Sequence, residues 1–164
     1  MGKFAVLALR VVLVALLAGS LFVQTVMVVL LSRDLEDIPE LAYGPGPILV
    51  IVVLGILAAQ VVLACVWQLV SMVRRGTVFS PAAFRYVHVM IGGFVAAALL
   101  AFALGVVLAP GEAVAPGVVL LIGGIGLAIL GVALVVVVLR MLLAQAVARD
   151  VEAAQMQAEL GEVI

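Results

Sequence analysis

Four long apolar stretches without a charged residue dominate the sequence. They cover residues 11–31, 48–70, 87–108 and 118–139. As helices rising 1.5 Å per residue they would be roughly 31 to 35 Å long, which matches a bilayer hydrocarbon core about 30 Å thick. In lipid a continuous helix satisfies every backbone hydrogen-bonding group, so even the valine-rich stretches are expected to be helical. The sequence therefore predicts an all-α protein whose four helices cross a membrane.

Composition excludes several classes of function. Hydrophobic residues make up 68% of the chain and charged residues 10%, whereas soluble domains are about 25% charged. The net charge of -1 leaves no basic surface for nucleic-acid phosphates, so direct nucleic-acid binding is not expected. The single cysteine, Cys65, excludes an intrachain disulfide and a cysteine-rich metal site.

The first apolar stretch has a second interpretation, a secretory signal peptide. Lys3 and Arg10 precede it, and small residues occur within positions 15–20. However, the apolar region continues to Leu31, well beyond the 7 to 15 residues of a signal peptide's apolar core. We expect a retained membrane span.

The basic residues predict the orientation of the spans. Seven of the eight Lys and Arg residues fall on one side of the predicted membrane: Lys3, Arg10, Arg74, Arg75, Arg85, Arg140 and Arg149. The other side carries only Arg33, in an acidic loop. By the positive-inside rule, both termini are expected in the cytoplasm.

The two longer connections between the spans differ in character. The expected external loop, residues 32–47, carries four carboxylates and ends in Gly-Pro-Gly-Pro, which is not expected to continue a helix. The carboxylates could bind a cation, but they lack the spacing of a calcium loop, so a solvated acidic loop is favoured. On the cytoplasmic side, Gly76, Ser80 and Pro81 predict a tight helical hairpin, with one helix capped by Gly76 and the next starting at Pro81.

Two residues of this hairpin are candidate partner contacts, Phe79 and Arg85. Phe79 either packs against the end of the bundle or anchors the chain at the lipid interface, and both interpretations stay open.

The fourth helix is expected to continue through residues 140–164 as a cytoplasmic tail. Apolar residues keep one stripe along it, with Arg149 in an intervening slot: Leu142, Ala146, Ala153, Met156, Leu160 and Val163. Because the tail is otherwise acidic, anionic lipid should repel it, and the stripe has more reason to contact protein. Met156 and Leu160 are the candidate contacts. The alternative is a solvated helix without a partner.

Polar residues within the spans are few. None near the bilayer centre is ionisable, so a proton-coupled exporter or an ion pump is poorly supported. Gln24 and Gln60 are the candidate intramembrane polar residues, and we expect them to hydrogen-bond each other or a neighbouring backbone. A packing role is favoured over a substrate site. His88 is expected at the membrane interface rather than in a proton relay.

Small residues give two spans smooth faces for close helix packing. They are Gly93, Ala97, Ala101 and Gly105 in the third span and Gly124, Ala128 and Gly131 in the fourth. Such faces serve contacts within one chain or between two copies. The chain offers no cluster of nucleophile, acid, base or metal ligands, so we predict no catalytic, cofactor-binding or metal-binding residue and no enzymatic activity.

Three short motifs carry a resemblance to a known family: the turn at 75–80, the segment 84–87 and the charged end at 159–164. With them, the chain resembles a family of small bacterial four-span integral membrane proteins of unknown function. Ala83 stands where that family often has Asn. The resemblance implies a multi-pass protein of the bacterial cytoplasmic membrane. It also implies a gene often placed beside a Cro/CI-type helix-turn-helix regulator, and hence a cytoplasmic regulator as partner.

Together these observations predict a four-helix transmembrane bundle with both termini inside and the fourth helix extended into the cytoplasm. Its partners would be the lipid bilayer and either a regulator or a second copy of the chain. The favoured function is that of a non-enzymatic regulatory or scaffold protein that acts through the hairpin and the tail. A small transporter or permeability factor is the alternative.

Overall fold

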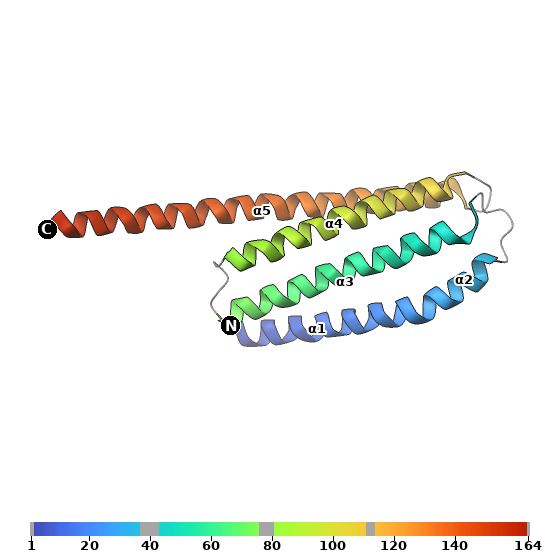
Figure 1. Cartoon of the computed structure of the whole chain (residues 1–164), viewed down its shortest axis with the longest axis horizontal. Coiled ribbons are helices and arrows are strands. Elements are labelled where there is room, and N and C mark those ends of the chain that lie inside the picture. Colours follow the sequence, from blue (N-terminus) through green and yellow to red (C-terminus); the bar gives the residue numbers. More distant parts are fainter. Residues whose placement is uncertain (1, 37–42, 76–80, 111–113, 164) are drawn as a thin grey trace.

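The computed structural model describes residues 2–36, 43–75, 81–110 and 114–163. All the regular secondary structure of these residues is helical (Figure 1). The first rod comprises α1 (Gly2–Phe22), a π-helical turn η1 (Val23–Met27) and α2 (Val28–Glu36). Three further helices follow: α3 (Pro45–Arg75), α4 (Pro81–Leu108) and α5 (Pro116–Val163). The first rod and these three helices are long and apolar enough to cross a membrane. The prediction of an all-α protein with four such segments is confirmed.

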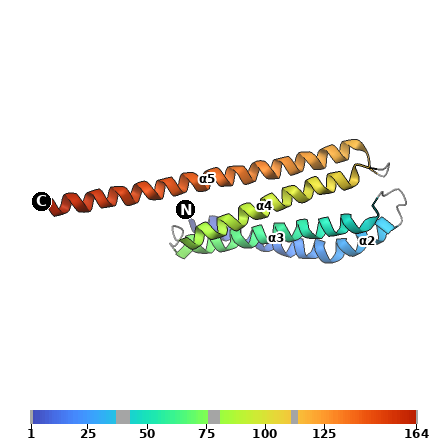
Figure 2. The same cartoon turned by 45° about the horizontal axis from the view of Figure 1, so that its top comes forward.

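The four rods lie in a row that follows the order of the chain. The first rod and α4 both pack against α3, and α5 packs against α4. Figures 1 and 2 show the same order from two directions, with the first rod at one edge and α5 at the other. The bundle is therefore open. α1, α3, α4 and α5 alternate in direction, so the start of α1, the end of α3 and the start of α4 share one end of the row.

Small residues bring α4 and α5 together. A Cβ atom added to Gly126 of α5 would lie 3.3 Å from the Cβ of Ala101 and 3.4 Å from the backbone oxygen of Ala98. Ala98 and Ala133 are almost fully buried, with 1% and 2% of their surface exposed. Since lipid tails are as apolar as the side chains, such van der Waals contact is a main source of helix association in a membrane.

Only part of the expected small-residue faces is used in this way. On α4, Gly93 approaches Val62 of α3, where an added Cβ would lie 2.6 Å from the Val62 Cγ2, and Gly105 faces α5. On α5, however, Gly124 and Gly131 are exposed and have open space where a Cβ would stand. α5 carries small residues on more than one face, and the face that packs against α4 is that of Gly126.

The helix ends correct one expectation about the loops. α2 reaches Glu36 and α3 begins at Pro45, so the connection is shorter than the predicted 32–47. Pro45 and Pro47 fall in the first turn of α3, where the backbone N–H groups have no partner within the helix and proline is tolerated. Gly44 has a φ of 70°, a left-handed conformation that favours glycine and lets the chain turn before the helix.

The start of α4 at Pro81 agrees with the predicted hairpin. The other hairpin positions, Gly76, Phe79 and Ser80, lie outside the described residues.

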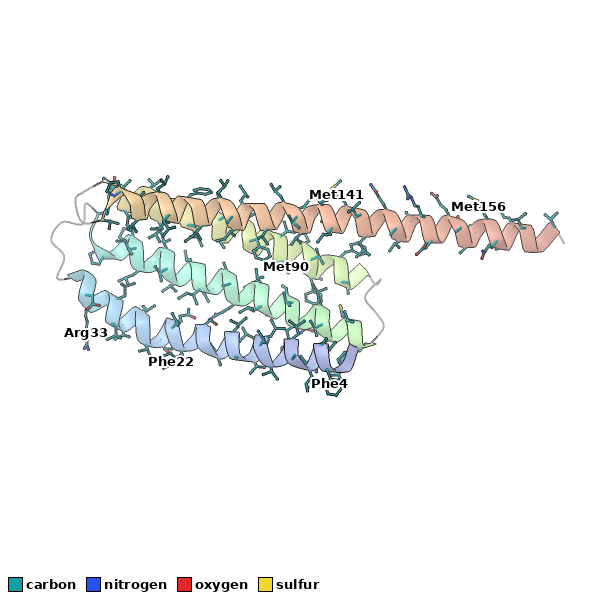
Figure 3. All side chains as sticks on the ribbon, turned by 180° about the vertical axis from the view of Figure 1, so that it is seen from behind. Phe4, Phe22, Arg33, Met90, Met141 and Met156 are labelled. Carbon is teal, nitrogen blue, oxygen red and sulfur yellow. The ribbon has the colours of Figure 1, made fainter. Side chains whose placement is uncertain are left out.

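α5 is far longer than a membrane span. Its 48 residues correspond to roughly 72 Å, about twice the length needed to cross a bilayer. It continues as one helix through Arg140 to Val163, which confirms the predicted helical tail, and Ile164 lies outside the described residues. Residues 140–163 are here named the α5 extension. It begins beside α4, and its distal part, which includes Met156, runs past the ends of the other rods (Figures 1 and 3).

The contact at Gly126 gives a first prediction. Gly126→Leu should destabilise the protein by about 1 to 3 kcal/mol, because the new side chain has no space between the two helices. Gly124→Leu is the matched control, since it adds the same side chain to the open face of α5. Unfolding in mixed micelles measures both. Equal effects of the two substitutions would contradict the packing described.

Candidate functional site

A cluster of three polar side chains joins the first rod to α3. The Nε2 of Gln60 donates hydrogen bonds to the Oε1 of Gln24 at 2.9 Å and to the Oγ of Ser20 at 3.3 Å. The Ser20 hydroxyl in turn donates to the carbonyl of Leu17 at 2.9 Å. The structure thus contains the hydrogen bond expected between the two glutamines. Both amide hydrogens of Gln60 are used inside the protein, as a polar group surrounded by lipid requires.

The irregular turn η1 surrounds Gln24 and was not foreseen from the sequence. A π-helical turn is wider than an α-helical one, and such turns occur often at functional sites. The hydroxyl of Thr25 lies 2.9 Å from the carbonyl oxygen of Leu21 and 3.1 Å from that of Phe22. It thereby supplies a donor to carbonyls beside the irregular turn. The adjacent pair Gln24 and Thr25 in an apolar helix is the only local signal of this feature.

A second polar link between α1 and α3 involves Arg10. Its Nη2 donates to the Oγ of Ser71 at 3.1 Å, and its guanidinium carbon lies 5.3 Å from the ring centroid of Trp67, within cation–π range. The Ser71 hydroxyl donates to the Trp67 carbonyl at 3.0 Å. The Nε of Arg10 is buried and has no hydrogen-bond partner among the described residues. Sequence reasoning missed this link because Arg10 and Ser71 are 61 positions apart.

Arg10 and Ser71 also line a cavity at this end of the row. Arg74 and Arg75 complete the described lining, and the cavity has a volume of about 350 Å³. Three guanidinium groups therefore face one space, and no carboxylate belongs to the lining that the structure describes. Such an arrangement attracts anions.

The end of the row that holds this cavity is rich in arginine. On α4, the candidate contact Arg85 is exposed there. Nearby, the Nη1 of Arg140 on α5 lies 3.4 Å from the Nδ1 of His88. Because a guanidinium has no acceptor, Arg140 is the donor in this pair and the His88 nitrogen accepts. We call this end of the row the arginine-rich end; its arginines are Arg10, Arg74, Arg75, Arg85 and Arg140.

The other candidate contacts lie far out on the α5 extension. Met156, labelled in Figure 3, is 61% exposed and Leu160 is 65% exposed. Met156 lies roughly 24 Å along the helix from Arg140. The structure therefore does not bring Met156 or Leu160 together with Arg85. Phe79 lies outside the described residues.

The membrane-length part of α5 carries an apolar hollow on its open face. Its volume is about 450 Å³. Its lining residues are Gly117, Leu120, Leu121, Gly124, Ile125 and Ala128. Two of the small residues predicted for close packing, Gly124 and Ala128, therefore line this open hollow rather than the contact with α4.

The chemistry of the described sites is that of hydrogen bonding and charge. Within the part of the chain that the structure describes, no group of three His, Cys, Asp or Glu side chains could hold a metal ion. The side chains that are brought together are amides, hydroxyls and guanidiniums. These can link helices and bind anions.

Comparison with known families gives a match over residues 29–164 to the family described as protein of unknown function, DUF2975. The chain belongs to the DUF2975 family. No curated protein matches it, and neither does any solved structure. The resemblance to a family of unknown function is thus confirmed for this DUF2975 protein. The link to a neighbouring regulator stays a prediction. The match includes α3, α4 and the whole α5 extension.

The glutamine pair gives a second prediction, a double-mutant cycle with Gln24→Leu and Gln60→Leu. The two changes should couple by about 0.6 to 2 kcal/mol, the range for a hydrogen bond between membrane helices. Unfolding of the reconstituted DUF2975 protein measures this energy. Gln68→Leu is the control, because Gln68 is an exposed glutamine of α3 and should not couple to Gln24. Strict additivity of Gln24→Leu and Gln60→Leu would contradict the pairing.

Proposed function

We propose that this DUF2975 protein is a non-enzymatic, multi-pass protein of the bacterial cytoplasmic membrane with a regulatory or scaffolding role. It acts by holding a partner protein on the α5 extension. The observation that carries the proposal is the exposed helix itself: every described residue from 148 to 163 is exposed although the helix continues unbroken from the membrane-length part of α5.

The surface of the extension supports a helical partner. Its apolar stripe alternates steps of four and three residues from Leu142 to Val163, the spacing of a coiled-coil seam. Leu142, Met156, Leu160 and Val163 are all largely exposed. In water a helix gains most of its stability from packing an apolar face. A second helix laid along the stripe would supply that packing.

A cytoplasmic regulator fits this stripe better than a second copy of the chain. Arg149 occupies one position of the seam. In two membrane-anchored copies the extensions would run parallel, and their Arg149 side chains would meet as like charges at the seam. A different protein can place a carboxylate opposite Arg149.

The proposed orientation rests on charge. All the arginines described at the arginine-rich end belong to the side that carries seven of the eight basic residues, so the positive-inside rule assigns this end and the α5 extension to the cytoplasm. An acidic extension is repelled by the anionic inner leaflet, which keeps its stripe available to protein.

A small transporter is the second candidate function, and the polar cluster beside η1 is the observation that favours it. Polar groups beside a π-helical turn in the middle of an apolar rod could contact a solute. The two hydrogen bonds donated by Gln60 favour the packing role over this alternative.

The third prediction concerns the stripe. A photo-crosslinking residue at Met156 or Leu160 should give a discrete protein adduct in native membranes, whereas the same residue at Val151 or Ala158, on the opposite face of α5, should not. The mass of the adduct distinguishes a regulator from a second copy. Met156→Asp with Leu160→Asp should abolish the adduct formed from Leu142, because two charges on the seam oppose its burial.

The matched control for this experiment is Val151→Asp with Ala158→Asp, which adds the same charge to the other face. Adducts of equal yield from both faces, or from neither, would show that the α5 extension is a solvated end without a specific partner.

The fourth prediction tests the orientation by labelling single cysteines on a Cys65→Ala background. An impermeant thiol reagent added to intact cells should label a cysteine at Asp34 or Ala115. It should not label one at Ala82 or Glu159 until the cells are lysed. The reverse pattern would refute the proposed orientation.

A further inference from the structure

The geometry points to a binding site for the phosphate group of an anionic phospholipid in the cavity between α1 and α3. The cavity is lined by Arg10, Ser71, Arg74 and Arg75. Its volume of about 350 Å³ lies at the lower end of small-molecule pockets, which span roughly 300 to 1,000 Å³. Guanidinium groups bind phosphate oxygens through paired hydrogen bonds. The Ser71 hydroxyl positions Arg10 rather than binding the anion, because its one hydrogen already bonds the Trp67 carbonyl.

Arg10 is held in place before any ligand arrives. Trp67 lies beneath its guanidinium and Ser71 accepts one of its hydrogen bonds. Its buried Nε has no partner among the described residues, so part of the guanidinium group is shielded from water and still has hydrogen-bonding capacity. A fixed, partly desolvated cation binds an anion more strongly than a mobile, solvated one.

The local charge favours an anion despite the helix end nearby. The negative end of the α3 dipole, about half a charge, lies at Arg74 and Arg75. Three full positive charges outweigh it, and the positive ends of the α1 and α4 dipoles share this end of the row. Without an anion the three cations only repel one another.

The depth of the cavity favours a lipid as the source of the phosphate. Arg10 directly precedes the apolar stretch 11–31, and Arg74 and Arg75 follow the stretch 48–70. These residues therefore stand where the hydrocarbon core ends and the headgroups begin. Trp67 is a residue typical of that level. A basic pocket between membrane helices at the headgroup level suits an anionic headgroup while the acyl chains lie along the apolar rods.

The test is native mass spectrometry of the full-length, delipidated protein titrated with phosphatidylglycerol, with phosphatidylcholine and with inorganic phosphate. Arg74→Gln with Arg75→Gln should weaken phosphatidylglycerol binding about tenfold, the effect of losing charge-assisted hydrogen bonds. Both side chains are exposed, so the folded core is preserved. Arg10→Gln should weaken binding similarly, and Arg10→Lys should not restore it, because lysine lacks the planar fork.

The matched control is Arg85→Gln with Arg149→Gln, which removes two positive charges outside the cavity. Unchanged phosphatidylglycerol affinity in this control, together with weaker binding of phosphatidylcholine to the original protein, supports the lipid site. Equal losses in the control and the cavity variants would overturn it, since they indicate unspecific attraction. Arginine-dependent binding of inorganic phosphate without binding of either lipid would overturn the lipid as the source.

Discussion

The structure depends on the need of every backbone N–H and C=O group for a partner where no water is present. Continuous helices meet this need, and once they have formed, the apolar environment gives them little reason to associate. The rods are therefore held by a few specific contacts. Close approach at Gly93 and Gly126 joins α3, α4 and α5, whereas polar links at Gln60 and Arg10 join the first rod to α3.

An open row held in this way places its functional chemistry at the ends and edges. The arginine-rich end gathers cations because charged groups are excluded from the apolar, membrane-length stretches of the rods. α5 has α4 on one side only, which leaves the face of Gly124 open. Beyond the other rods, the extension exposes Met156 and Leu160. The arginine-rich end is the proposed site for a phospholipid headgroup, and the α5 extension is the proposed contact for a partner protein.

The sequence predicted what hydropathy and local spacing encode. Four spans, the start of α4 at Pro81 and the helical tail all follow from such signals, and the few polar residues of the spans predict that Gln24 bonds Gln60 or a neighbouring backbone group. Three features were not predicted: the order of the rods, the use of Gly126 rather than Gly124 in the contact with α4, and the polar link between Arg10 and α3. A helix that is apolar on all sides has no apolar stripe to show which face packs. The hydrogen bond between Arg10 and Ser71 joins residues 61 positions apart, so no local sequence pattern indicates it.

The proposed function requires that α5 leaves the membrane as one helix and presents a single face to a partner protein. Spin labels placed one at a time along residues 130–162 in native membranes test this requirement through their accessibility to oxygen and to a water-soluble relaxation agent. We expect access to oxygen up to about residue 139, then access to the aqueous agent with a helical period and protection at Ala153, Met156 and Leu160. Uniform aqueous access throughout the extension, or continued access to oxygen, would contradict it.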